Sequence, residues 1–296
     1  MLLTKKFFGT SALPEIDLTE EKLRELAQSS VNAGLTVPGV QKKLSLHLTG
    51  GDTPRLTLVG YPAGYILKPR SDEYPYLPES EDLAMDIADA MGMSTVPHGL
   101  IETSAGLAYI TARIDRISSK TQGEVSLAME DFCQLTERLT SDKYKSSYER
   151  CAGVIDRFSS RPGLDKAEFF LRLVVCFLTG NSDMHLKNFS LIETAPSSRE
   201  FGLSPAYDML PVNLVLPEDT DETALTLCGK RSNLKKADFL RLAESIAISE
   251  NAAKKMISAC LKKRARAFDL CEASYLPEEM KKAFTALFEE RAARLI

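Results

Sequence analysis

Alternating apolar and polar residues predict a small sheet in the first part of the chain. Leu44, Leu46 and Leu48 alternate with polar residues, which is the period of a half-buried strand. Gly50-Gly51-Asp52 then predicts a hairpin turn into a return strand. The predicted strands are 44–48, 55–59, 65–68 and 107–114. A helix is predicted between the last two, over 79–91, because its apolar residues recur on one face.

The apolar pattern becomes helical beyond about Arg116. Ser249 and Pro277 occupy helix-start positions, as an N-cap and as a first-turn proline. Helices are predicted over 17–30, 130–139, 148–158, 166–178, 249–270 and 278–295, with a strand over 189–192. A sheet-rich first part followed by a helical second part predicts an α+β, two-lobed fold. Its predicted domains are a β-rich N-lobe over 1–113 and a helical C-lobe over 114–296.

Composition narrows the class of protein. The chain has 296 residues, of which 44% are hydrophobic and 26% charged, as in ordinary globular proteins. Its net charge is −4, so nothing favours nucleic acid or membrane as a direct partner. A basic cluster at 262–266 is interpreted as the solvated face of a helix.

Cysteine and histidine patterns give no sign of a disulfide framework or a zinc site. The six cysteines form no C-x-x-C pair, so we expect reduced thiols, and the three histidines have no metal-binding spacing. No apolar stretch approaches the ~18 residues of a membrane span, and the N-terminus lacks a signal-peptide apolar run. A cytoplasmic location is therefore the expectation.

The segment with the most chemical content follows an apolar run at 169–178. This run predicts a buried helix that ends at Thr179-Gly180-Asn181, where Gly and Asn are turn residues. Four polar side chains then occupy six positions: Asp183, His185, Lys187 and Asn188. Polar groups so close to a core helix are costly unless they have partners or a chemical role.

Phosphoryl transfer requires this set of side chains. One carboxylate orients the attacking hydroxyl, while an amide five residues later and a further carboxylate hold Mg²⁺ on the nucleotide phosphates. Asp183 and Asn188 have that spacing, and Asp208 lies among apolar neighbours farther along. Helix caps and turns produce the same spacing, so the spacing alone leaves a structural role open.

Asn181-Ser-Asp-Met-His-Leu-Lys-Asn-Phe-Ser190 resembles the catalytic loop of HipA-type serine/threonine kinases, the toxins of bacterial toxin–antitoxin systems. Further blocks resemble that family in the same order: Pro38–Leu46, Tyr65–Pro69, Arg113–Arg116 and Gly229–Leu234. The resemblance runs from about Leu35 to the C-terminal helices. It implies a protein-kinase-like fold and the cofactors ATP and Mg²⁺.

The resemblance also implies roles for the loop residues. Asp183 would orient the substrate hydroxyl, and Lys187 would neutralise charge on the transferred phosphoryl group. Asn188 and Asp208 would bind Mg²⁺. His185 matches a histidine of the family loop, with a hydrogen-bonded structural histidine as the equal alternative.

The nucleotide would be held by residues of the first lobe. Lys68 is the candidate lysine for the α- and β-phosphates, although a lysine on an edge strand is the alternative. Its acidic partner would be Glu81, with Glu79 in reserve. Ala112 and Ile114 would contact adenine at the hinge. The phosphate-loop residues would be Val37, Pro38, Gly39, Val40, Gln41 and Lys43.

Autophosphorylation in the phosphate loop switches off kinases of this family. Thr36 occupies the position of the modified serine, and Ser29 and Ser30 are neighbouring alternatives. A phosphate there would add about −1.5 to −2 charges where the nucleotide phosphates belong.

Full-length HipA-type proteins carry an additional N-terminal subdomain before the phosphate loop. This chain instead resembles the shortened, HipT-like toxins of three-component systems. The resemblance implies three partners: a small antitoxin-like protein corresponding to that subdomain, a DNA-binding antitoxin, and an aminoacyl-tRNA synthetase as substrate. A catalytically silent kinase-like binding module is the main alternative, and a small-molecule kinase is a third.

Overall fold

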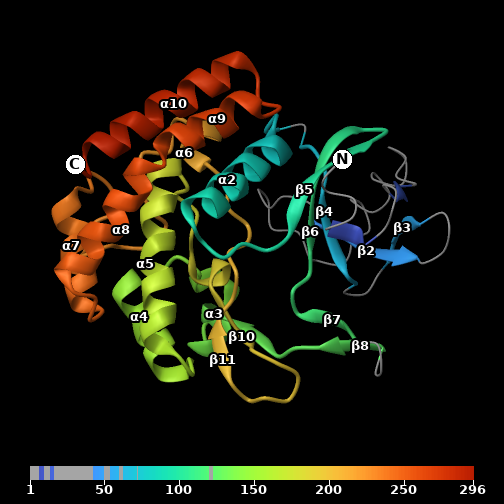
Figure 1. Ribbon diagram of the computed structural model, residues 1–296, viewed down its shortest axis with the longest axis horizontal. Coiled ribbons are helices and arrows are strands. Elements are labelled where there is room, and N and C mark those ends of the chain that lie inside the picture. Colours follow the sequence, from blue (N-terminus) through green and yellow to red (C-terminus); the bar gives the residue numbers. More distant parts are fainter. Residues whose placement is uncertain are drawn as a thin grey trace. The chain divides into compact units, whose positions relative to one another are not determined.

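The computed structural model describes residues 7–9, 14–16, 43–49, 54–59, 63–71, 73–119 and 123–296 (Figure 1). These residues form two compact units. The first takes the described residues up to Asp82 together with Val96–Arg116, and the second takes Leu83–Thr95 and Ile117–Ile296.

The first unit is built on a mostly antiparallel sheet. Its strands run in the order β1-β3-β2-β4-β6-β5, with β1 and β3 parallel. Their bounds are β1 Glu15–Ile16, β2 Leu44–Thr49, β3 Arg55–Leu58, β4 Tyr65–Lys68, β5 His98–Thr103 and β6 Gly106–Ala112. The predicted strands at 44–48, 55–59, 65–68 and 107–114 are thereby confirmed.

One face of this sheet carries the core of the first unit. Leu44, Leu46, Leu56 and Leu67 are buried there, in line with the alternation read from the sequence. Helix α2, Leu77–Met91, follows β4 and confirms the helix predicted at 79–91. Strand β5 was not predicted, because Gly99 and Glu102 weaken its apolar alternation.

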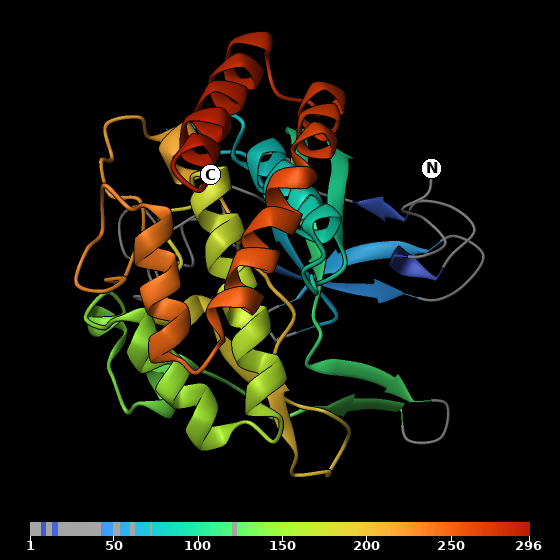
Figure 2. The same cartoon turned by 60° about the vertical axis from the view of Figure 1, so that its left-hand side comes forward.

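The second unit is mainly helical (Figure 2). Its helices are α3 Phe132–Leu135, α4 Tyr148–Phe158, α5 Pro162–Thr179, α6 Val212–Val215, α7 Lys236–Ser245, α8 Glu250–Lys262, α9 Arg264–Ala273 and α10 Glu278–Ala293. A three-stranded sheet joins β9 Met129–Asp131, β10 Ser190–Glu193 and β11 Phe201–Leu203, and β7 Arg116–Ser119 pairs with β8 Gly123–Ser126.

Helix α5 is the centre of the second unit. It begins with Pro162, whose fixed φ suits the first helical position. Its side chains from Phe169 to Thr179 are buried except Leu171, and it packs against α4, α8 and α10. Figures 1 and 2 show α5 surrounded by these helices. The helix ends where Gly180 adopts φ 73°, a left-handed conformation that favours glycine.

Three expectations from the sequence need correction. The chain does not turn directly helical after Arg116, because β7, β8 and β9 come first. The helix predicted at 130–139 is reduced to α3, since Glu130 and Asp131 pair with β10. The helix predicted at 249–270 is divided at Lys263 into α8 and α9. The predicted helix at 17–30 and hairpin turn at 50–52 lie outside the described residues.

The remaining sequence features fit this fold. All six cysteines are free thiols, and five of them are buried. Residues 262–266 are exposed at the junction of α8 and α9. No helix in the described part of the chain has the length and apolar character needed to cross a membrane.

Candidate functional site

The loop after α5 carries most of the candidate catalytic residues. The left-handed turn at Gly180 lets the Asn181 N–H donate to the Cys176 carbonyl at 2.8 Å. Asn181 Oδ1 then accepts from the Asp183 N–H at 3.1 Å. Two consecutive turns therefore direct the chain away from the buried helix and bring Asp183 to a partly exposed position.

The Asp183 side chain is 44% exposed, and one of its oxygens accepts a short hydrogen bond. The Tyr144 hydroxyl donates to Asp183 Oδ1 at 2.6 Å. Burial and this hydrogen bond raise the pKa of Tyr144, so the phenol keeps its proton at neutral pH. Sequence reasoning missed Tyr144, because it lies far from the loop in sequence and belongs to no motif.

His185 is buried beside this pair. Its ring meets the Tyr144 ring edge-on, with 5.0 Å between the centroids, and its Nε2 lies 4.0 Å from Asp183 Oδ2. Burial lowers the pKa of His185, and the nearby Asp183 carboxylate only partly opposes this effect. His185 therefore contributes a neutral ring at neutral pH.

Asn188 is tied to the same loop. Its Nδ2 donates to the Asp183 carbonyl at 2.9 Å, which fixes the amide plane. The side-chain oxygen, Oδ1, is the group that remains suited to binding a cation. The structure thus brings Asp183 and Asn188 together as the spacing predicts.

Asp208 follows β11 and is partly exposed. Its φ of 57° is left-handed, a conformation that aspartate adopts more readily than most residues. The preceding segment is held in place because the Ala206 N–H donates to the Ser94 carbonyl at 2.7 Å. The Asp208 carboxylate acts to raise the pKa of His185, against the larger lowering by burial, as expected for a charge near the same loop.

Lys187 has a partner that the sequence did not reveal. Its Nζ lies 2.7 Å from Asp131 Oδ2, and the other oxygen of Asp131 caps α3 by accepting from the Gln134 N–H. The Tyr207 hydroxyl contacts the Lys187 carbonyl at 3.1 Å. Asp131 therefore anchors Lys187 while beginning the next helix.

The first unit holds Lys68 in a buried ion pair. Lys68 Nζ lies 2.5 Å from Glu81 Oε1, and the two side chains are 4% and 2% exposed. Glu79, the reserve candidate, instead accepts from Arg70. Lys68 is thus a buried, paired lysine rather than one whose ammonium extends into solvent from an edge strand.

The other first-lobe candidates are only partly described. The Ala112 N–H already donates to the Pro97 carbonyl at 2.9 Å, and Ile114 follows β6 with a half-buried side chain. Lys43 is exposed just before β2. The candidates outside the described residues are Ser29, Ser30, Thr36, Val37, Pro38, Gly39, Val40 and Gln41.

The donors present suit a magnesium ion held jointly by protein and nucleotide. Asn188 and Asp208 offer an amide oxygen and a carboxylate, which are hard ligands of the kind Mg²⁺ prefers. Within the described ranges, no three His, Cys, Asp or Glu residues gather into a group suited to a metal. Mg²⁺ typically takes one or two carboxylates and completes its shell with phosphate and water.

Comparison with known families decides the class of protein. The model of the HipA-like C-terminal domain family matches residues 35–268. The chain belongs to this family. The resemblance read from the sequence is therefore confirmed.

Relatives of this HipA-like chain include inferred kinases. One from Haemophilus influenzae is 25% identical over 286 residues, which cover 88% of this chain and 82% of the relative. Y4dM of Sinorhizobium fredii is 33% identical over 231 residues, covering 73% of this chain. The chain spans 54% of Y4dM, about half of that relative's length.

Two solved structures share the fold of this HipA-like chain. HipA of Shewanella oneidensis, solved with HipB and operator DNA, matches with a TM-score of 0.73 and 18% identity, over 92% of this chain and 70% of its own. The Helicobacter pylori proinflammatory kinase CtkA matches with a TM-score of 0.55 and 17% identity, over 87% and 92%. These matches confirm the predicted α+β, protein-kinase-like fold.

Proposed function

We propose that this HipA-like protein is a Mg-ATP-dependent serine/threonine protein kinase and the toxin of a toxin–antitoxin system. The observation that carries the proposal is the loop geometry. Asp183 presents a half-exposed carboxylate, and Asn188 is locked by a hydrogen bond to the Asp183 backbone. This is the division of labour that phosphoryl transfer requires, with a base beside a metal-binding amide.

Asp183 receives the proton of the substrate hydroxyl as its oxygen attacks the γ-phosphorus. Asn188 and Asp208 would hold Mg²⁺, which when bound would offset charge on the phosphate oxygens. His185 supplies a neutral polar ring beside the base. Lys187 offsets charge on the transferred group, and its ion pair with Asp131 fixes its direction of approach.

Lys68 contacts the α- and β-phosphates and is held in place by Glu81. A lysine with a buried carboxylate partner loses little conformational freedom when a phosphate binds. Backbone amides of the segment from Val37 to Gln41, with Lys43, are proposed to cradle the phosphates. Because the Ala112 N–H is already used within the protein, the Ile114 amide and the Ala112 carbonyl are the proposed contacts to adenine.

Partners and substrate follow from the family. HipA of Shewanella oneidensis was solved with HipB and operator DNA, which supports a DNA-binding antitoxin as a partner of this chain. We extend this proposal to a small antitoxin-like protein as a further partner, to an aminoacyl-tRNA synthetase as substrate, and to a cytoplasmic location. A catalytically silent binding module is the competing function.

Thermal unfolding with and without Mg-ATP separates these two functions. A ligand at about 100 times its Kd adds about 2.7 kcal/mol of stability, so we expect the melting temperature of the wild type to rise by several degrees. Asp208→Ala removes a proposed metal ligand and should lose this rise. The matched control is Asp156→Ala, which removes an exposed carboxylate on α4.

A radiolabelled transfer assay completes the test. Asp183→Asn should keep the Mg-ATP stabilisation and lose transfer of the γ-phosphate to protein, including to purified aminoacyl-tRNA synthetases. The absence of any Mg-ATP shift in wild type shown by intact mass to be unphosphorylated would contradict the kinase and favour the silent module.

A further inference from the structure

We propose that Tyr144 is the positioning residue for the general base: its hydroxyl holds Asp183 Oδ1 and leaves Oδ2 to receive the substrate proton. The inference rests on the proposed kinase function and adds a residue to its machinery. Tyr144 follows a short 3-10 turn, Thr140–Asp142, and lies outside every block that resembles the HipA-type family.

The contact has a defined direction. The Tyr144 hydroxyl lies 2.6 Å from Asp183 Oδ1, and the phenol is the donor because the carboxylate can only accept. Asp183 Oδ2 lies 4.0 Å from His185 Nε2, which is beyond hydrogen-bond distance. The two oxygens therefore have different surroundings, and Oδ2 is the one suited to an incoming hydroxyl.

Two hydrogen bonds to its backbone carbonyls hold the Tyr144 segment, one from the loop that carries Asp183 and one from the Arg231 side chain. The Leu186 N–H donates to the Lys143 carbonyl at 3.2 Å. Arg231 Nη2 donates to the Tyr144 carbonyl at 3.0 Å. With the ring also packed against His185, Tyr144 is fixed by contacts on its backbone, its ring and its hydroxyl.

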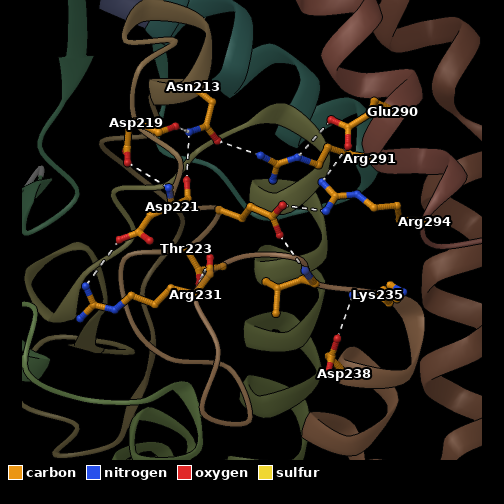
Figure 3. Close-up of polar contacts among 12 residues, drawn as sticks. Asn213, Asp219, Asp221, Thr223, Arg231, Lys235, Asp238, Glu290, Arg291 and Arg294 are labelled. Atoms are coloured by element: carbon orange, nitrogen blue, oxygen red, sulfur yellow. Dashed lines mark hydrogen bonds and ion pairs between the residues drawn. The ribbon is translucent and has the colours of Figure 1, made fainter.

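Arg231 gives a function to the Gly229–Leu234 block, which the catalytic scheme does not otherwise use. Figure 3 shows its guanidinium directed at Asp221, with 3.7 Å between Nη1 and Oδ2. Within the separate turn at 219–221, the Asp221 N–H donates to Asp219 Oδ1 at 3.1 Å. The other oxygen of Asp219 accepts from the Ser182 hydroxyl at 2.8 Å. Arg231 thus braces Tyr144, and the turn at 219–221, which Arg231 contacts, braces Ser182, the neighbour of the base.

These anchors argue against Tyr144 as a placeholder that must leave before substrate binds. A placeholder would need a segment free to move, whereas the backbone carbonyls of Lys143 and Tyr144 are bound by two other parts of the unit. A fixed donor restricts rotation of the carboxylate and keeps it in a productive orientation. The activation barrier is lower because the carboxylate does not have to reorient during the reaction.

The proton balance is simple. The substrate oxygen forms a bond to the γ-phosphorus, while the bond from that phosphorus to the β,γ-bridging oxygen breaks and releases ADP. The hydroxyl proton passes to Asp183 Oδ2. Tyr144 keeps its own proton throughout, consistent with burial and the carboxylate having raised its pKa.

The test is the rate of phosphate transfer from Mg-[γ-³²P]ATP to the chain itself, followed at mapped phosphosites other than Tyr144. For Tyr144→Phe we expect the maximal rate to fall by roughly 10- to 100-fold, with the KM for ATP nearly unchanged. The Mg-ATP thermal shift should also persist, which would show a folded protein. Tyr275→Phe is the matched control, since Tyr275 is an exposed tyrosine on the same unit and should behave as wild type.

Arg231→Ala provides a second variant that keeps the phenol. It should give a smaller loss of maximal rate by loosening the segment.

If wild type transfers phosphate and Tyr144→Phe transfers it equally fast or faster, the positioning role is overturned and the kinase assignment stands. If Tyr144 itself is the sole phosphorylated residue, it is an acceptor and the positioning role is also overturned. If wild type binds Mg-ATP and transfers nothing, the proposed function fails and the role of Tyr144 falls with it.

Discussion

At the scale of single residues, the choice between Glu79 and Glu81 shows what sequence can decide. Both carboxylates lie on the first turns of α2, and both are almost fully buried. Periodicity alone does not separate them, whereas the family resemblance favoured Glu81. The structure pairs Glu81 with Lys68, and Arg70 donates to Glu79. Two neighbouring glutamates thus pair with different basic side chains.

The Lys68–Glu81 pair yields a prediction that separates stability from function. Lys68→Met removes the cation that balances a buried carboxylate, so it should lower the free energy of unfolding by about 3–5 kcal/mol. The double variant Lys68→Met/Glu81→Met replaces both charges with apolar groups and should recover most of that loss. Denaturant unfolding followed by circular dichroism measures both effects.

Nucleotide binding provides the matched readout for this pair. The double variant should be as folded as the wild type and yet show little or no Mg-ATP thermal shift, because the proposed phosphate ligand is gone. A double variant that kept the full shift would assign Lys68 a purely structural role.

At the scale of elements, the sequence predicted helices best where apolar residues recur with the helical period and no strand pairing interrupts them. The helices at 148–158 and 166–178 appear as α4 and α5 because their apolar faces are continuous. The prediction for 130–139 failed because Asp131 serves two partners. It pairs in β9 and caps α3, so the strand displaces the first turn of the expected helix. The pairing of these residues with β10, which is distant in sequence, determines the strand, and the local sequence pattern does not indicate that pairing.

The candidate site divides in the same way. Asp183 and Asn188 were predictable because they lie five residues apart on one loop. Tyr144, the partner of Asp183, and Asp131, the partner of Lys187, were not predictable, because each comes from a distant segment brought in by tertiary packing. Side chains that support a site leave weaker sequence signals than the side chains that perform its chemistry.

An arginine of helix α10 is connected to the start of the candidate catalytic loop. Arg291 is buried, and its Nη2 donates to Asn213 Oδ1 at 3.1 Å (Figure 3). Its guanidinium also lies 4.9 Å from the centre of the Phe177 ring on α5. Asn213 in turn donates its backbone N–H to the Gly180 carbonyl at 2.9 Å. The C-terminal helix therefore helps to fix the turn from which the loop begins.

Replacement of Arg291 tests this connection. Arg291→Ala removes a charged hydrogen bond and a ring contact from a buried setting, and we expect it to lower the free energy of unfolding by about 2–3 kcal/mol. The control is Arg264→Ala on α9, which removes an exposed ion pair with Glu289 and should change stability by less than about 1 kcal/mol. Equal effects of the two variants in denaturant unfolding would contradict the role of Arg291.

At the scale of the whole molecule, each compact unit carries one part of the proposed chemistry. The first holds the paired Lys68, and the second holds the base and the metal-binding side chains. The family match over residues 35–268 includes both parts together with the proposed phosphate-loop residues. A chain organised in this way is expected to need both units for phosphate transfer, and its own phosphate loop is a natural first acceptor.

The proposed self-modification provides the test at this scale. After incubation with Mg-ATP, intact-mass spectrometry and phosphosite mapping should find phosphate on Thr36 in the wild type and none in Asp183→Ala. The modified protein should also lose its Mg-ATP thermal shift, because about −1.5 to −2 added charges would repel the nucleotide phosphates. Thr36→Val should keep the shift after the same incubation, since it cannot accept the phosphate. Phosphate on Ser29 or Ser30 alone would move the regulatory position within the same segment. Equal phosphate on wild type and Asp183→Ala would identify a contaminating kinase and contradict the assignment of Asp183 as the base.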